Sequence, residues 1–310
     1  MSSLNQPSPA HYIGRFAPSP TGPLHFGSLV SALASYLDAH HKGGKWLVRM
    51  EDLDPPREQP GAADAILRCL ESYGLEWDDS VLYQSRRRDI YEDYLSRLHR
   101  QGLLYACDCT RQDLQAMGGV YNGRCRTRSV DTGLPHALRL KLYDLPAIYD
   151  LHDELCFEDL IQGTQCQHLR TEAGDQILKR KDGLYAYQLA VVVDDIEQHI
   201  THIIRGSDLL EVSARQIFLF QLLEARVPAF GHVTLASQPN GQKLSKQNLA
   251  PALALEDAGT NLWQALTFLG QQPPLELRGA TAADLLSWGK THWQRKAVQG
   301  LSAIYAPHQK

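Results

Sequence analysis

Apolar positions along the chain follow two different periods. Short apolar runs predict β-strands at 12–17, 46–51, 186–193 and 200–204. Apolar residues at helical spacing, such as Leu29, Leu33 and Leu37, predict helices at 25–41, 62–73, 86–101 and 208–226. This alternation predicts an α/β fold of Rossmann type, in which a doubly wound parallel sheet carries helices on both faces.

The periodic pattern lapses between about residues 105 and 185 into short segments, turns and a cluster of cysteines. We interpret 105–185 as a module inserted between two halves of the α/β domain, 1–104 and 186–250. Residues 251–310 follow as a short helical tail, with helices predicted around 261–269 and 282–290 and the turn Gln272-Pro273-Pro274 between them.

The loop that follows the first predicted strand has the composition of a phosphate site. Prolines and glycines break residues 18–23 into a tight loop, and His25-Phe26-Gly27-Ser28 then opens a helix. Unpaired backbone N–H groups and the positive end of the helix dipole favour an anion at such a position. Gly27 lets a flat base approach the backbone, and His25 offers a further donor to a phosphoryl oxygen. On this segment alone, a loop glycine and a surface histidine without a ligand remain the alternative.

A second segment, Lys243-Leu244-Ser245-Lys246-Gln247, follows the turn Pro239-Asn240-Gly241. Two lysines three residues apart on one loop can both reach a polyphosphate. Cations brought to the charge that develops as pyrophosphate leaves stabilise that charge electrostatically. A solvated basic turn is the alternative, but it does not account for the first segment.

Together, these two segments resemble the HIGH and KMSKS signatures of class I aminoacyl-tRNA synthetases. Residues 15–28, with Glu51-Asp52-Leu53-Asp54 after a strand, are similar to the glutamyl branch in particular, and the resemblance covers about residues 12–249. It implies an ATP-dependent ligase that forms glutamyl-adenylate from L-glutamate and ATP with Mg²⁺. The catalytic residues that it implies are His25, Lys243 and Lys246, and the ATP-binding residues are His25, Gly27, Ser28 and Lys246.

The charges of glutamate predict what its pocket must contain. Two carboxylates and one ammonium group call for two arginines and one acidic residue. The resemblance assigns the arginines to Arg15 and Arg205 and the acid to Glu51. The further glutamate-binding residues that it implies are Phe16, Ala17, Pro18, Ser19 and Tyr187, the last of which we expect to open a strand with its hydroxyl available to the substrate.

Within that branch, the chain is most similar to a shortened group whose members activate glutamate without tRNA. They then transfer it to the queuosine in the anticodon of tRNA(Asp), which the resemblance makes a partner of this chain. Only 248–310 follow the second signature, which we expect to be too short for a full anticodon-binding domain. Two alternatives stay open: a ligase that charges the acceptor end of a tRNA, and a non-catalytic RNA-binding relative.

The chain has six cysteines, and three of them are closely spaced: Cys107, Cys109 and Cys125. We expect a cytosolic chain to keep its thiols reduced, so close cysteines suggest a metal site, with buried apolar cysteines as the alternative. The nearby residues offer no histidine or cysteine as a fourth ligand. The resemblance supplies Tyr121, and so implies a structural zinc site of Cys107, Cys109, Tyr121 and Cys125 within the inserted module. We interpret Cys69 as a core residue and Cys156 and Cys166 as structural.

The net charge of −4 excludes a broadly basic nucleic-acid-binding surface, so any RNA contact must come from local patches. Basic residues cluster at 86–88, at 124–128 and at 179–181, where a solvated surface is the alternative reading. No stretch is apolar enough to cross a membrane, and the first ten residues lack a signal-peptide core. We therefore expect a cytoplasmic protein with no membrane partner, acting as a monomer.

Overall fold

The computed structural model describes residues 11–145, 154–237, 251–298 and 304–305. The second signature, which contains Lys243 and Lys246, lies outside the described residues.

Parallel strands form the centre of the molecule. Strands β1 (Ile13–Phe16), β2 (Lys45–Met50) and β3 (Leu82–Tyr83) pair in the order β1-β2-β3, and β9 (His202–Gly206) pairs with β10 (Ala229–Val233). The two sets meet where β9 lies beside β1, because the Thr201 N–H donates to the Ile13 carbonyl at 2.9 Å. From this junction, the strand order continues through β2 and β3 on one side and to β10 on the other. The order of successive strands therefore reverses between β1 and β9.

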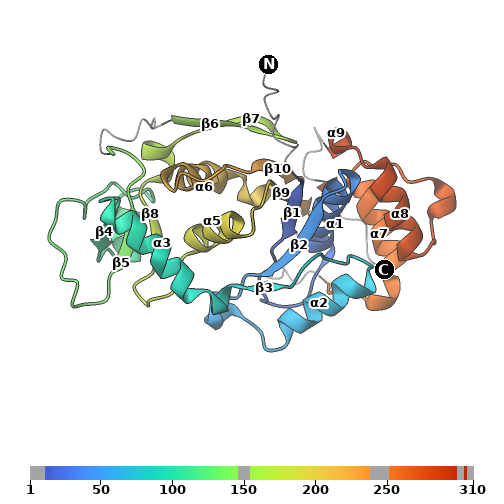
Figure 1. The fold of residues 1–310 in the computed structure, drawn as a ribbon, viewed down its shortest axis with the longest axis horizontal. Helices are drawn as coiled ribbons and strands as arrows, with labels where there is room; N and C mark the ends of the chain where they lie inside the picture. Colours follow the sequence, from blue (N-terminus) through green and yellow to red (C-terminus); the bar gives the residue numbers. More distant parts are fainter. Residues whose placement is uncertain (1–10, 146–153, 238–250, 299–303, 306–310) are drawn as a thin grey trace, which may run out of the picture.

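Helices cover both faces of these strands (Figure 1). Along β2, Trp46 and Val48 belong to one buried cluster and Leu47 to another, as the alternation of side chains along a strand requires. The first cluster contains residues of α1 (Phe26–His41), α2 (Ala62–Ser72), α7 (Ala258–Phe268), α8 (Ala282–His292) and α9 (Arg295–Val298). The second contains residues of α3 (Arg88–Arg100), α5 (Tyr187–Glu197) and α6 (Leu210–Leu222). The prediction of an α/β fold with a parallel sheet is confirmed.

The segment between α3 and α5 is mainly antiparallel. Strands β4 (Leu104–Cys107), β5 (Ala137–Leu140) and β8 (Gln176–Lys179) form one small sheet, and α4 (Arg111–Ala116) follows β4. Strands β6 (Glu154–Asp159) and β7 (Gly163–His168) form a hairpin whose turn contacts β10, since the Leu160 N–H donates to the Phe230 carbonyl at 2.7 Å. A further short pair is β11 (Ala236–Ser237) with β12 (Ile304–Tyr305).

The hairpin corrects the expectation that every cysteine is reduced. Cys156 and Cys166 lie opposite each other in the β6–β7 register and form a disulfide, with their Cα atoms 4.1 Å apart. The sequence did not reveal this pairing because ten residues of separation carry no signal until the hairpin register is known. Cys69 is buried in the core on α2, as predicted.

The strand predicted at 186–193 is wrong, since this segment is the helix α5. The run from Leu189 to Val193 is buried at every position, so it lacks the polar positions that mark a helix with one exposed face. A short, wholly apolar run is compatible with either a buried strand or a buried helix. The helix predicted at 208–226 is also shorter than expected, because α6 ends at Leu222.

Candidate active site

A cavity of about 500 Å³ opens at the carboxyl ends of β1 and β9, where open α/β sheets bind ligands. It brings together every predicted glutamate-binding and ATP-binding residue of the described chain. These are Arg15, Phe16, Ala17, Pro18, Ser19, His25, Gly27, Ser28, Glu51, Tyr187 and Arg205. The residues come from β1 and its loop, the start of α1, the residue after β2, the start of α5 and β9. Their predicted roles are therefore compatible with one binding site.

His25 occupies the position before the first turn of α1. Its Nδ1 accepts a hydrogen bond from the Ser28 N–H at 3.3 Å and so caps the helix. A neutral imidazole whose Nδ1 is an acceptor carries its proton on Nε2. The ring is therefore in the tautomer that donates from Nε2, at the end of the helix that favours anions.

The ends of the segment that contains the second signature lie beside this cavity. Ala236, just before that segment, lines the cavity. Just after it, Ala252 pairs with His25 in an isolated antiparallel bridge, and the Leu253 N–H donates to the Leu24 carbonyl at 2.9 Å. The chain therefore leaves the site and returns to it on either side of 238–250.

Arg15 is buried within β1 and is paired with Asp195 of α5. Arg15 Nε donates to Asp195 Oδ1 at 3.1 Å and Nη2 to Oδ2 at 3.5 Å. Burial raises the pKa of Asp195, but Arg15 and Arg49 outweigh that effect and lower it, so the carboxylate is charged. Among the described residues, Asp195 binds Nε and Nη2 of Arg15. The third nitrogen, Nη1, can therefore serve a ligand.

Arg205 is held in a similar way at the end of β9. Its Nε donates to His232 Nε2 at 3.0 Å, and its Nη2 donates to Ser213 Oγ at 2.8 Å and to the Leu209 carbonyl at 3.2 Å. Its Nη1 makes a long contact of 3.5 Å with the Tyr187 hydroxyl. Burial lowers the pKa of Arg205, so an anionic ligand would offset the cost of this buried charge.

Glu51 follows β2 and lies 3.7 Å from the guanidinium of the fully buried Arg49. Burial raises the pKa of Glu51 to about 7, although Arg49 and Arg15 lower it. The described residues give Glu51 Oε1 no hydrogen-bond donor. An ammonium group in the cavity would therefore favour the ionised form of this carboxylate.

The structure corrects the setting of Tyr187, which begins α5 and does not open a strand. It also adds residues that the sequence reasoning missed: Arg49, Asp195 and His232, which contact the cavity residues from behind. The sequence did carry one signal, because two aspartates directly after a long apolar run are unusual. Asp194 and Asp195 are both buried on α5.

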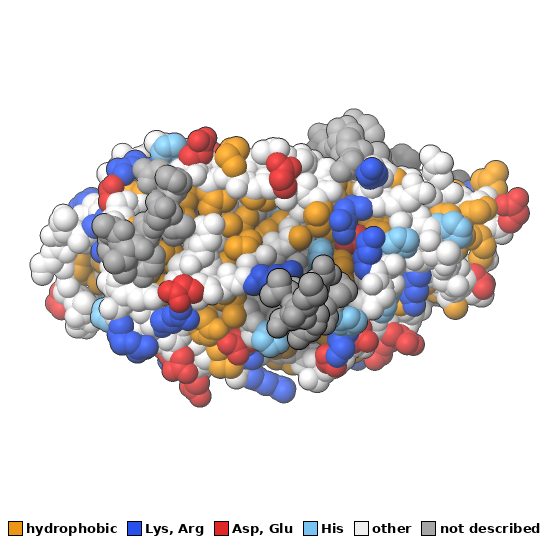
Figure 2. Space-filling model, turned by 45° about the horizontal axis from the view of Figure 1, so that its top comes forward, with side chains coloured by type: hydrophobic (Ala, Val, Ile, Leu, Met, Phe, Trp, Pro, Cys, Tyr) orange, Lys and Arg blue, Asp and Glu red, His pale blue; other side chains and the backbone are white. Residues whose placement is uncertain are grey.

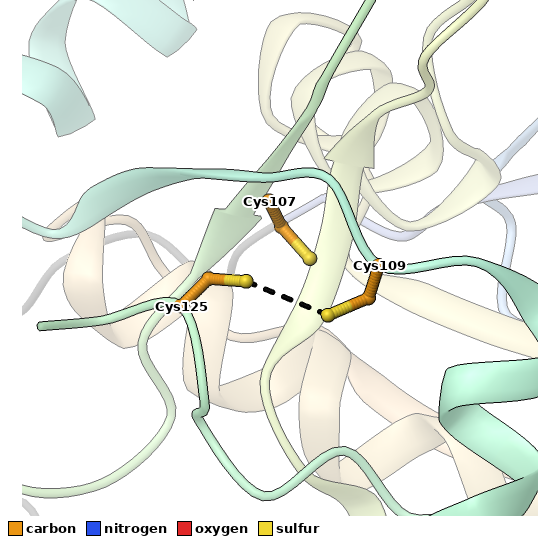
Figure 3. A group of neighbouring side chains, drawn as sticks. All are labelled: Cys107, Cys109 and Cys125. Atoms are coloured by element: carbon orange, nitrogen blue, oxygen red, sulfur yellow. Dashed lines mark hydrogen bonds between the residues drawn. The ribbon is translucent and has the colours of Figure 1, made fainter. Parts of the chain in front are cut away.

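The sulfurs of Cys107, Cys109 and Cys125 converge on one point (Figure 3). All three Sγ atoms lie within 4.8 Å of one another, and those of Cys109 and Cys125 are 3.5 Å apart. The Tyr121 hydroxyl lies 3.6 Å from Cys107 Sγ and accepts a hydrogen bond from the Cys125 N–H at 2.8 Å. Tetrahedral zinc with Zn–S bonds of about 2.3 Å separates its sulfurs by roughly 3.8 Å. The three cysteines therefore form a candidate metal site, and the Tyr121 hydroxyl lies beside it.

Two arginines lie next to these sulfurs. Arg139 Nε donates to Cys107 Sγ at 3.2 Å, and Arg128 Nη2 lies 3.4 Å from Cys125 Sγ. Burial raises the pKa of Cys125, but hydrogen bonds with the Tyr121 hydroxyl and Arg128 lower it to about 7. Burial and the neighbouring thiols raise the pKa of Cys109 to about 12, so a metal ion bound here would have to displace the proton of that thiol.

The basic clusters considered for RNA contact are largely paired with acidic residues. Arg87 Nε donates to Asp194 at 2.6 Å, Arg126 forms two bonds with Asp175, and Lys179 pairs with Glu92. On the face in Figure 2, basic and acidic side chains are interspersed. Contact of these clusters with RNA stays a prediction. None of the helices in the described part of the chain has the length and apolar character needed to cross a lipid bilayer.

A family model, curated relatives and a solved structure resemble this chain over most of its length. The family model described as "tRNA synthetases class I (E and Q), catalytic domain" matches residues 13–271. A protein of Pseudomonas fluorescens named glutamyl-Q tRNA(Asp) synthetase is 52% identical over 292 residues, covering 93% of each chain. Its namesake from Ectopseudomonas mendocina is 52% identical over 287 residues, covering 93% of this chain and 95% of its own. A solved glutamate-tRNA synthetase from Elizabethkingia anophelis has a TM-score of 0.78 at 26% identity, covering 94% of this chain and 68% of its own.

Proposed function

Since this chain belongs to the glutamyl and glutaminyl class I tRNA synthetases, we propose that it activates glutamate with ATP and transfers it to the queuosine of tRNA(Asp). The observation that carries the chemistry is the single cavity in which two guanidinium groups, one carboxylate and the start of α1 face the same space. The target of the transfer is the one named in the Pseudomonas relatives.

Glutamate binds through charge complementarity with three side chains. Arg15 and Arg205 each use their Nε edge on the protein, and their Nη1 atoms engage the two carboxylates of the substrate. Glu51 receives the ammonium group. Tyr187 adds a hydroxyl beside Arg205, and residues 16–19 form the wall of the pocket.

ATP binds next to glutamate, with its phosphates at the start of α1. A carboxylate oxygen of glutamate attacks the α-phosphorus in line, the new O–P bond forms, and pyrophosphate leaves. His25 donates from Nε2 to a phosphoryl oxygen, while Gly27 and Ser28 accommodate the nucleotide. Lys243 and Lys246 belong to the segment whose two ends lie beside the cavity. They stabilise the phosphates together with Mg²⁺. This half-reaction proceeds without tRNA.

A zinc ion held by Cys107, Cys109, Tyr121 and Cys125 has a structural role in this proposal. It ties the end of β4 to the loop that carries Tyr121 and Cys125. We further propose that residues 105–185 are a module inserted between two halves of the catalytic domain, 1–104 and 186–250, with 251–310 as a helical tail.

A ligase that charges the acceptor end of a tRNA is the second candidate. It is supported by the similarity to the Elizabethkingia glutamate-tRNA synthetase, but that similarity has half the sequence identity of the Pseudomonas relatives. The chemistry of activation is the same in both candidates. They differ only in the hydroxyl group that receives glutamate.

Two measurements test the proposal. ATP–pyrophosphate exchange with glutamate and no tRNA should occur at a rate well above that with glutamine or aspartate, and no exchange would refute activation by this chain. Radiolabelled glutamate should then appear on tRNA(Asp) that carries queuosine and not on the same transcript with guanosine at that position. After nuclease cleavage, the label should remain with the anticodon stem-loop. Label on the 3′-terminal adenosine would favour the second candidate.

A further inference from the structure

Arg205 is the end of a buried chain of hydrogen bonds that starts outside the cavity. His232 of β10 is fully buried, and its Nε2 accepts from Arg205 Nε at 3.0 Å. The other ring nitrogen, Nδ1, lies 2.5 Å from Asp159 Oδ2. Asp159 is the last residue of β6, so the hairpin β6–β7, which lies beside β10 and α6 in Figure 1, reaches the cavity through His232.

The contacts of Asp159 fix which nitrogen of His232 carries the proton. Asp159 Oδ1 accepts from the N–H groups of Ile161, Gln162 and His232 at 3.0, 2.8 and 3.1 Å. These bonds leave Oδ2 to accept from His232 Nδ1–H. Burial lowers the pKa of His232, although Asp159 raises it, and a neutral ring with its proton on Nδ1 has an unprotonated Nε2. That atom can accept the Arg205 Nε–H.

We propose that Asp159 and His232 are positioning residues that hold Arg205 with its Nη1 directed into the cavity. This inference rests on the glutamate-binding role proposed for Arg205. Three of the five Arg205 N–H groups are engaged on the side away from the substrate, by His232, Ser213 and the Leu209 carbonyl. The orientation of the guanidinium therefore depends on His232 presenting a lone pair, which depends in turn on Asp159.

Asp159→Asn reverses this arrangement with almost no change in shape. The three backbone N–H groups require an acceptor at the Oδ1 position, so the amide oxygen takes it and the amide NH₂ faces His232 Nδ1. The ring then accepts at Nδ1 and carries its proton on Nε2, where it opposes the Arg205 Nε–H and donates instead to Ser213 Oγ, which lies 3.1 Å away. We expect the KM for glutamate to rise about 10- to 100-fold, the cost of losing a charge-assisted hydrogen bond. The KM for ATP should change less than about 2-fold, since a uniform loss would indicate general damage.

Further variants separate positioning from folding. His232→Leu removes the acceptor and should raise the KM for glutamate, whereas His232→Gln supplies an amide oxygen to Arg205 and should recover part of the loss. Glu158→Gln is the matched control, because Glu158 is the exposed neighbour of Asp159 and its side chain accepts a hydrogen bond from Thr164 on the hairpin. It should leave both KM values unchanged. In ¹⁵N NMR of histidine-labelled protein, His232 should be protonated on Nδ1 in the wild type and on Nε2 in Asp159→Asn.

The outcomes distinguish this inference from the proposed function. If Arg205→Ala leaves the KM for glutamate unchanged, the proposed role of Arg205 is wrong and the inference falls with it. If Arg205→Ala raises that KM while Asp159→Asn and His232→Leu do not, only the positioning role is wrong. Equal increases in both KM values, or a wild-type His232 protonated on Nε2, would also overturn it.

Discussion

Replacing Glu51 with glutamine should stabilise the free protein above neutral pH while it weakens glutamate binding. Glu51 lines the cavity with its side chain 9% exposed, and its partial burial raises its pKa from an ordinary value of 4.5 to about 7. In the unfolded chain the same carboxyl has its ordinary pKa. The folded state therefore binds a proton more tightly than the unfolded state, which favours folding below pH 4.5. This contribution is lost as the pH rises from 4.5 through 7.

The size of the effect follows from the two pKa values. A difference of 2.5 pKa units at 1.36 kcal/mol each corresponds to about 3 kcal/mol that the ionised carboxylate costs the free protein at pH 8. Glutamine keeps the shape of the protonated acid and cannot ionise. The advantage of Glu51→Gln should therefore grow from about 1 kcal/mol at pH 5 to about 3 kcal/mol at pH 8, or roughly 5 °C or more in Tm.

Scanning calorimetry of the wild type and Glu51→Gln at pH 5 and pH 8 measures this difference, and Glu71→Gln on the exposed face of α2 is the control. Saturating glutamate should raise the Tm of the wild type, because its ammonium group stabilises the carboxylate, and should raise that of Glu51→Gln much less. A variant that melts at or below the wild-type temperature at pH 8 would refute the reasoning. It would show that Arg49 and Arg15 compensate the buried charge in full.

Four further predictions concern activation, the metal site and the disulfide. His25→Asn keeps a capping oxygen for α1 but loses the Nε2 donor, so tRNA-free pyrophosphate exchange should fall about 10²- to 10³-fold without a change in Tm; an unchanged rate would remove His25 from catalysis. Lys246→Ala should lower the same exchange rate by a similar factor and leave glutamate affinity, measured by calorimetry, unchanged. Metal analysis should find one zinc per chain, lost in Cys125→Ser and retained in Cys69→Ser, and zinc in neither protein would exclude the site. Thiol titration of the denatured protein should give four free thiols before reduction and six after it, whereas six at the start would contradict the disulfide.

Much of the local structure could be predicted because its causes are local. Apolar spacing at Leu29, Leu33 and Leu37 defines α1, and the prolines and glycines before it define the loop that delivers His25. The position of Arg205 at the end of an apolar strand also followed from the sequence. The ligand set of the cysteine cluster came from a family resemblance, since spacing by itself gave three thiols and no fourth ligand.

The two predictions that failed, the strand at 186–193 and the reduced state of Cys156 and Cys166, both depend on tertiary contacts. The sequence predicts a strand at 186–193 because the run 189–193 is buried at every position, and a fully buried run shows no helical alternation of polar and apolar residues. The pairing of Cys156 with Cys166 depends on a strand register that local patterns do not specify.

The sequence by itself determined that His25 stands at a helix start and Arg205 at the end of a strand, because those positions depend on propensities within a few residues. Only the tertiary structure decided what those side chains face. Arg15 meets Asp195 across 180 residues of sequence, and Arg205 meets a histidine whose tautomer is set by Asp159, 73 residues away from it. The pKa of Glu51 likewise depends on its exclusion from water, which arises only when β1, β2 and α5 pack together. Charge and proton position in this site are long-range properties of the packed chain, and for that reason no local pattern encodes them.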